Sequence, residues 1–263
     1  MTSLLPCPNR FRMHRFYLPP AECQGSPLVL SDCEAHRAVH VLRVRERERV
    51  VVLNGAGDEF LCEVQKAHRR EVALRVVQKN SHLPRPCQIT LIQAVTKGKT
   101  MDLIVQKATE LGAHRLVPIL SERTVAHISG DNAKAKTGKW EETAIEAIKQ
   151  CDSAWLPSIE PPLTPPAFVA RNERFELPLV ASLQRDARNP REHFRAFLAE
   201  HQRLPRSVCV WVGPEGDFTP TEIGAICDAG ARPITLGQLV LRSETAAIYC
   251  LAVINYELQS PRY

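Results

Sequence analysis

The sequence predicts an α/β protein of two parts, in which a small β-rich module precedes a larger domain built on a parallel sheet. Three observations lead to this prediction. The first third of the chain reads as short strands, a proline-containing segment follows near residue 83, and strand and helix patterns then alternate. Such alternation is typical of a parallel sheet covered by helices. We therefore expect one domain over residues 1–82 and a second over residues 83–263.

The composition is that of an ordinary globular protein. Of the 263 residues, 44% are hydrophobic and 24% are charged, with a formal net charge of +5. These proportions exclude a disordered or fibrous protein. No stretch approaches the ~18 consecutive apolar residues of a membrane-spanning helix, and prolines and arginines interrupt the N-terminal segment where a signal peptide would be apolar. We expect a cytoplasmic protein with no membrane partner.

The elements of the small module follow from short-range patterns. Residues 50–67 read as two strands joined by a turn at Asn54-Gly55, and residues 71–79 continue as a third strand. Residues 32–43 are predicted to form one helix, because apolar side chains recur there at helical spacing. The module thus resembles a small β-barrel.

Positive charge is concentrated in this module, since residues 1–82 hold 13 Lys and Arg against 9 Asp and Glu. Arginines crowd residues 10–15 and 43–49. A solvated face is one interpretation, because glutamates interleave with the second group. A surface that follows nucleic-acid phosphates is the other.

The larger domain is predicted from regularly alternating patterns. The expected strands cover residues 89–95, 114–121, 176–183, 207–213 and 231–237. The expected helices cover residues 99–112, 137–151, 191–201, 219–230 and 243–258. Gly112 is expected just past the end of the first of these helices. Residues 156–166 are rich in proline and should form a surface excursion.

Several function classes are excluded by missing motifs. The chain has no GxxxxGK[ST] phosphate loop, and its one GxG lies in the predicted hairpin turn, which excludes a dinucleotide-binding start. The absence of GxSxG weakens an α/β-hydrolase interpretation. The nine cysteines are odd in number and irregularly spaced, so we expect reduced thiols. Cys33, His36 and His40 have no further ligand pair nearby, so no metal site is predicted.

Two glycine-containing strand-to-helix junctions remain, both near the C-terminus. In residues 211–224, Gly213 and Gly216 let the backbone turn sharply and approach a ligand. Ligands of α/β folds bind at such strand ends, although a plain tight connection would also use glycine. The helix that follows is expected to begin with an N-cap, a first-turn proline and a capping-box acid at Thr219, Pro220 and Glu222.

The second junction, residues 234–250, contains an apolar loop at Leu239–Leu241 that leads to Arg242 and Ser243. Ser243 is a suitable N-cap, so helix initiation explains part of the pattern. Leucines held in a loop also suggest a floor for a flat apolar group such as an adenine ring.

These motifs resemble a known family. The Gly-Pro-Glu-Gly turn, the Phe-Thr-x-x-Glu helix start and the later LGQLVLRSETA segment resemble the SPOUT class of S-adenosylmethionine-dependent RNA methyltransferases. Within it, the pattern is similar to the bacterial 16S ribosomal RNA uracil-N3 methyltransferases, the RsmE family. The similarity covers nearly the whole chain, since residues 10–19, 40–60 and 91–124 also match segments of that family.

The resemblance implies an architecture, a cofactor and partners. It implies a SPOUT-type, trefoil-knotted α/β domain preceded by a PUA-like β-barrel that helps to hold RNA. It implies S-adenosyl-L-methionine as cofactor, 16S ribosomal RNA within the small ribosomal subunit as partner, and a homodimer whose active sites are completed across the interface. The implied reaction is methylation of N3 of a uridine.

The resemblance also implies site residues. Those expected to hold the cofactor are Leu183, Gly213, Pro214, Glu215, Gly216, Leu236, Gly237, Leu241, Ser243 and Thr245. Those expected to contact RNA are Arg12, Arg15, Arg43, Lys97 and Lys99. Because uracil N3 must lose a proton before it attacks, Arg242 is the candidate to stabilise the resulting anion, and Glu215 or Glu244 to accept the proton. An acid in the first helical turn, as at Glu244, also has a structural explanation.

The sequence departs from the family's usual pattern in four places. Asp217 stands where a second glycine is usual, Gln238-Leu239 replaces Pro-Arg, and Ser243 replaces threonine. The segment after Gln150-Cys151 lacks its usual basic residue. Two alternatives therefore stay open at this point: another SPOUT enzyme, such as a ribose 2′-O-methyltransferase, or a catalytically silent RNA-binding assembly factor.

Overall fold

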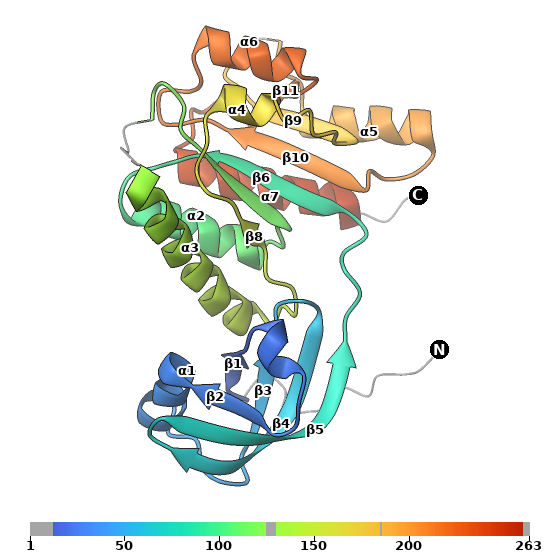
Figure 1. Cartoon of the computed structure of the whole chain (residues 1–263). Coiled ribbons are helices and arrows are strands. Elements are labelled where there is room, and N and C mark those ends of the chain that lie inside the picture. The colour runs from blue at the N-terminus through green and yellow to red at the C-terminus, as the bar shows by residue number, and fades with distance from the viewer. Residues whose placement is uncertain (1–12, 125–129, 185, 260–263) are drawn as a thin grey trace. The chain divides into compact units, whose positions relative to one another are not determined.

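The computed structural model describes residues 13–124, 130–184 and 186–259. They form two compact units, each with its own sheet (Figure 1). The first unit runs to Pro84 and also includes Ile148–Leu156, and the second holds the other described residues. A division at residue 82 therefore omits one segment, because Ile148–Leu156 returns to the first unit from the middle of the chain.

The first unit is a curled five-stranded sheet. Its strands are β1 (Arg15–Tyr17), β2 (Leu28–Ser31), β3 (Arg49–Leu53), β4 (Asp58–His68) and β5 (Glu71–Ser81). They lie in the order β1-β3-β4-β5-β2, and all pairs are antiparallel except β1 with β3. The predicted meander of three strands is confirmed as β3, β4 and β5. The sheet curls as a PUA-like half-barrel around a core that includes Phe16, Leu30, Val52 and Leu74.

The predicted helix of this unit is present but not uniform. α1 (Asp32–His36) continues directly into a π-helical segment, Arg37–Val41. Ala35 and Ala38 are both buried in the core of the unit. A short 3₁₀-helix, Pro20–Cys23, precedes β2.

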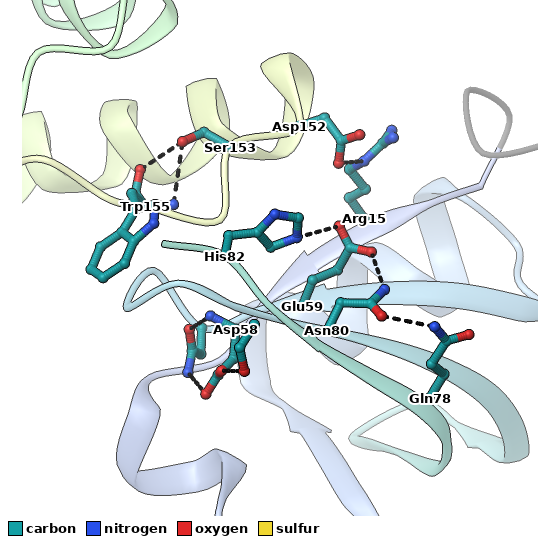
Figure 2. A network of polar contacts seen from close by, with 11 residues as sticks. Arg15, Asp58, Glu59, Gln78, Asn80, His82, Asp152, Ser153 and Trp155 are labelled. Atoms are coloured by element: carbon teal, nitrogen blue, oxygen red, sulfur yellow. Dashed lines mark hydrogen bonds and ion pairs between the residues drawn. The ribbon is translucent and has the colours of Figure 1, made fainter. Parts of the chain in front are cut away.

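The returning segment is held to the first unit by packing and by polar contacts. Ile148 and Leu156 pack with Val51 and Leu53 of β3. The Arg15 guanidinium lies 2.9 Å from the Asp152 carboxylate, and the Ser153 hydroxyl donates to the Trp155 carbonyl at 2.9 Å (Figure 2). Nearby, the buried Glu59 carboxylate accepts a hydrogen bond from the Asn80 amide at 3.3 Å (Figure 2).

The second unit is a parallel six-stranded sheet with helices on both faces. The strands are β6 (Gln88–Ala94), β7 (Arg115–Ile119), β8 (Ser158–Ile159), β9 (Leu177–Ala181), β10 (Ser207–Val212) and β11 (Arg232–Ile234), in the order β11-β9-β10-β6-β7-β8. The helices are α2 (Lys99–Glu110), α3 (Gly130–Cys151), α4 (Pro165–Val169), α5 (Pro190–His201), α6 (Pro220–Asp228) and α7 (Ser243–Gln259). The end of α3, from Ile148 onward, belongs to the first unit. Every neighbouring pair of strands is parallel.

The two faces of this sheet bury different helices. Phe168 of α4 and Ile223 of α6 pack on one face, against Trp211 of β10. On the other face α7 packs on β6, β10 and α2 (Figure 1). The predicted α/β class is confirmed. The trefoil knot stays a prediction.

The local predictions for this unit mostly agree with the structure. Gly112 follows α2 with φ +76°, a conformation that suits glycine. The proline-rich excursion contains more structure than expected: β8 extends the sheet, and α4 begins at an N-cap, Thr164, whose hydroxyl accepts the Ala167 N–H. Helix α3 begins seven residues earlier than the predicted residue 137.

The described cysteines are thiols and form no disulfide bond with one another. Burial raises the pKa of Cys62, Cys87, Cys209 and Cys250 to about 12, so these thiols stay protonated at neutral pH. Within the described ranges, no group of His, Cys, Asp and Glu has the arrangement of a metal site. None of the described helices is long and apolar enough to cross a membrane.

Candidate functional site

The strand ends of the second unit enclose a pocket. β11, β9 and β10 are parallel neighbours, so their carboxyl ends meet at one edge of the sheet. The segments that follow them, residues 181–184, 212–217 and 235–246, supply the walls of a pocket of about 280 Å³. This volume is near the lower end for small-molecule sites. Chain segments far apart in sequence thus converge on one cavity.

Most of the residues predicted to hold a cofactor line this pocket. They are Leu183, Gly213, Pro214, Glu215, Leu236, Gly237, Leu241 and Ser243. Gly216 and Thr245 are not among the lining residues, and neither are the candidate catalytic residues Arg242 and Glu244. These four lie between lining residues within the same segments, and Arg242 is exposed. Of the candidate catalytic residues, Glu215 is the one in the wall.

The first junction is held by a network around its helix. The capping box of α6 is present as predicted: Thr219 accepts the Glu222 N–H, and the Glu222 carboxylate accepts the Thr219 N–H at 2.9 Å. The other Glu222 oxygen accepts the Glu122 N–H at 2.9 Å, which ties α6 to the segment after β7. Close by, the Arg123 guanidinium donates to the Gly216 carbonyl. Hydrogen bonds from several segments therefore fix the conformation of this loop, which a plain tight connection would not require.

Asp217 closes the turn of this loop. Its φ is +59°, a conformation that favours glycine and that aspartate tolerates better than most residues. Its N–H donates to the Pro214 carbonyl at 3.0 Å, and one carboxylate oxygen accepts the Phe218 N–H at 2.8 Å. The other oxygen lies 3.5 Å from the Leu183 nitrogen, which joins two walls of the pocket. Asp217 itself lines the cavity.

Ser243 does not act as the predicted N-cap. It is the first residue of α7, and its hydroxyl turns inward, where it donates to the Gly213 carbonyl at 2.8 Å. The same hydroxyl accepts a hydrogen bond from the Gln93 amide at 2.9 Å. Gln93, at the end of β6, is fully buried and also donates to the Ala94 carbonyl. These hydrogen bonds hold Gly213, and with it the glycine wall of the pocket (residues 212–217), to the end of β6.

The apolar loop of the second junction lies open at the pocket. Leu239 and Val240 line the cavity, yet their exposed fractions are 77% and 74%. Leu183, on the opposite segment, is 63% exposed and also lines the cavity. Large apolar side chains are seldom left this accessible in a group unless something covers them. Exposed apolar side chains thus line the pocket, and their role as a floor for an adenine ring stays a prediction.

Sequence reasoning did not select several residues of this site. Asp217 was noted only as a departure from the family pattern, although it lines the wall. Gln184 and Thr235 also line it and carry no recognisable motif. Gln93 lies 150 residues from Ser243, so no local pattern could have linked them.

The predicted RNA-contacting residues are in different situations. Lys97 is exposed in the loop after β6, Lys99 is exposed as the first residue of α2, and Arg43 is exposed in the first unit. The Arg15 side chain is only 10% exposed and is paired with Asp152, which favours a structural role. Arg12 lies outside the described residues.

Comparison with known proteins agrees with this geometry. Residues 83–255 match an RNA methyltransferase domain, and residues 30–77 match an RNA methyltransferase PUA domain. The chain is 31% identical to ribosomal RNA small subunit methyltransferase E of Synechocystis sp., over 94% of this chain and 78% of that protein. It is 30% identical to the Mycobacterium tuberculosis protein of the same name, over 91% of this chain and 90% of that one.

Solved structures give the same result. A putative methyltransferase of Legionella pneumophila, in complex with S-adenosylmethionine, superposes with a TM-score of 0.83 at 30% identity, covering 92% of this chain and 97% of that one. A ribosomal RNA small subunit methyltransferase E of Neisseria gonorrhoeae, bound to S-adenosylmethionine, gives 0.79 at 27% identity, covering 92% and 96%. With a pocket at the expected strand ends and both domains matched, the chain belongs to the RsmE family of RNA methyltransferases.

Proposed function

We propose that this protein transfers a methyl group from S-adenosyl-L-methionine to N3 of a uridine in 16S ribosomal RNA, within the small ribosomal subunit. The observation that carries the proposal is the convergence of both glycine-containing junctions on one pocket at the carboxyl ends of β9, β10 and β11. The names of the relatives support the small-subunit ribosomal RNA as substrate, and the cofactor bound in two solved structures supports S-adenosylmethionine. The uridine N3 target rests on the family resemblance.

The residues of the pocket fit this cofactor. Leu183, Leu239 and Val240 offer exposed apolar surface against which an adenine ring would lose its contact with water. The carboxylates of Glu215 and Asp217 suit a ligand that carries positive charge. When bound, S-adenosylmethionine supplies an electrophilic methyl group on a sulfonium.

The chemistry asks two things of the residues near the pocket. They must hold the uracil in line with the methyl group, because an in-line displacement depends mainly on positioning. They must also let N3 lose its proton. Glu215, in the wall, and Glu244, beside it in sequence, are the candidates to accept that proton. Arg242 is the candidate to stabilise the uracil anion, since a fixed cation favours developing negative charge.

RNA binding is assigned to exposed cations on both units. Lys97 and Lys99 lie at the carboxyl end of β6, and Arg43 lies on the PUA-like unit. They would contact phosphates, which adds affinity and orientation but carries no sequence choice. We further propose the homodimer that the family resemblance implies, with each active site completed by the other subunit.

The test is methyl transfer from labelled S-adenosylmethionine to small ribosomal subunits that lack the modification, with free ribosomal RNA and transfer RNA in parallel. We expect 3-methyluridine, identified by mass and chromatographic retention, from the assembled subunits. A 2′-O-methylated product, or a preference for transfer RNA, would refute the proposed reaction. Cofactor binding without transfer to any RNA would leave the silent assembly factor as the better description.

A further inference from the structure

The charged side chains that line the pocket are all of one sign. Among the described lining residues, Glu215 and Asp217 are the ionisable ones, and both are acids. The cation bonded to the same loop, Arg123, donates to the Gly216 carbonyl and not to a carboxylate. The two acids make the wall negative. A ligand with one more positive charge is therefore favoured over an otherwise identical ligand.

Asp217 is the fixed member of this pair. Backbone N–H groups face both of its oxygens, that of Phe218 at 2.8 Å and that of Leu183 at 3.5 Å. Its own N–H is bonded to Pro214 within the same turn. Glu215, by comparison, is an exposed side chain. The carboxylate of Asp217 is therefore held in the wall by hydrogen bonds to the backbone.

The reaction changes the charge of the molecule that occupies the pocket. In methyl transfer, a bond forms between uracil N3 and the methyl carbon, the carbon–sulfur bond breaks, and its electron pair stays on sulfur. The proton of N3 leaves to a base or to water. The sulfonium thus becomes a neutral thioether, while the amino and carboxylate groups of the methionine part are the same before and after.

We propose that the Asp217 carboxylate makes this pocket select the sulfonium cofactor over the thioether product, so that the cofactor replaces the product in the pocket more readily than it would with a neutral wall. The inference rests on the proposed cofactor. A compact cavity of this volume is about 8 Å across, so a cation anywhere inside lies within about that distance of the wall. At effective dielectric constants of about 20 to 80, this separation corresponds to an affinity difference of about three- to thirtyfold.

The test compares affinities for S-adenosylmethionine and S-adenosylhomocysteine, measured by isothermal titration calorimetry on the full chain. Asp217→Asn removes the charge, keeps the shape, and tolerates positive φ. We expect its affinity for S-adenosylmethionine to fall about three- to thirtyfold while its affinity for S-adenosylhomocysteine stays within twofold. An analogue in which a protonated amine replaces the sulfonium should lose affinity for Asp217→Asn as S-adenosylmethionine does. That result would show that Asp217 recognises the positive charge and not the methyl group.

Two further variants serve as controls. Asp217→Gly suits the positive φ and should reproduce the effect of Asp217→Asn on the ratio of affinities. Glu200→Gln removes the same charge from an exposed side chain on α5 and should keep the wild-type ratio. Raising the salt concentration should weaken the wild-type preference more than that of Asp217→Asn.

The outcomes are distinct. If Asp217→Asn loses affinity for both ligands equally, Asp217 only shapes the loop and the inference is wrong. An unchanged ratio with unchanged affinities also overturns it. If the wild-type protein binds neither ligand, the proposed function itself fails, because the pocket then holds another molecule.

Discussion

Replacing Ser243 by alanine tests whether the buried hydrogen-bond chain behind the glycine wall supports the pocket. The hydroxyl is 3% exposed and makes two hydrogen bonds, accepting from Gln93 at 2.9 Å and donating to Gly213 at 2.8 Å. Without it the Gly213 carbonyl loses this donor, while the Gln93 amide keeps its bond to Ala94. A buried group left unsatisfied costs about 1–3 kcal/mol. Because Gln93 keeps this partner, one buried group is left without its hydrogen bond, and we expect the free energy of unfolding to fall by about 1–3 kcal/mol.

The assay has two readouts. Urea denaturation followed by far-ultraviolet circular dichroism gives the free energy of unfolding, and calorimetry gives the affinity for S-adenosylmethionine. We expect the affinity of Ser243→Ala for S-adenosylmethionine to fall about tenfold, because the Gly213 wall is held less firmly. This factor corresponds to a loss of about 1.4 kcal/mol of binding free energy. Ser243→Thr keeps the hydroxyl and should remain within about 1 kcal/mol of the wild type. The reasoning is refuted if Ser243→Ala is as stable as Ser243→Thr and binds as tightly.

Three other predictions concern separate parts of the protein. Gly57→Ala should destabilise the first unit by about 3 kcal/mol in denaturation experiments, because φ is +98° and the new Cβ would lie 2.5 Å from the Trp155 indole; a stable variant would contradict this. The Arg203 guanidinium lowers the pKa of Glu176 from 4.5 to about 2, so its stabilising contribution is present above pH 4.5 and lost as the pH falls towards 2. The difference in unfolding free energy between the wild type and Glu176→Gln should therefore shrink below pH 4.5, and a constant difference would count against the pairing. Arg242→Ala should lower the rate constant of methyl transfer about a hundredfold and leave cofactor affinity within threefold, as measured in single-turnover and binding assays; equal losses would make Arg242 a cofactor-binding residue.

Short-range signals in the sequence predicted much of the fold. The turn at Asn54-Gly55 correctly joins two strands, and Asn54 shows why: its side-chain oxygen accepts the N–H groups of Ala56 and Asp58. The capping box of α6 and the glycine after α2 were also predicted correctly, because each depends on residues within one turn of the helix end.

What the sequence could not reveal depends on contacts between distant residues. The return of Ile148–Leu156 to the first unit follows from packing against β3, about a hundred residues earlier in the chain. Ser243 was mistaken for an N-cap because a serine before a helical pattern has that role locally; its true partners, Gln93 and Gly213, are remote. That Asp217 lines the pocket likewise depends on a contact between two loops, in which its carboxylate faces the Leu183 nitrogen.

The link between Gln93 and Ser243 has a consequence for the order of folding. Because these residues are 150 positions apart, the pocket cannot form until most of the chain has been synthesised and the start of α7 has reached the end of β6. A nascent chain that stops before residue 243 lacks the partner that fixes Gly213, however well its earlier strands have paired. The proposed cofactor pocket thus depends on the complete fold. The amides around Gly213 should be among the last in the second unit to gain protection from hydrogen exchange during refolding.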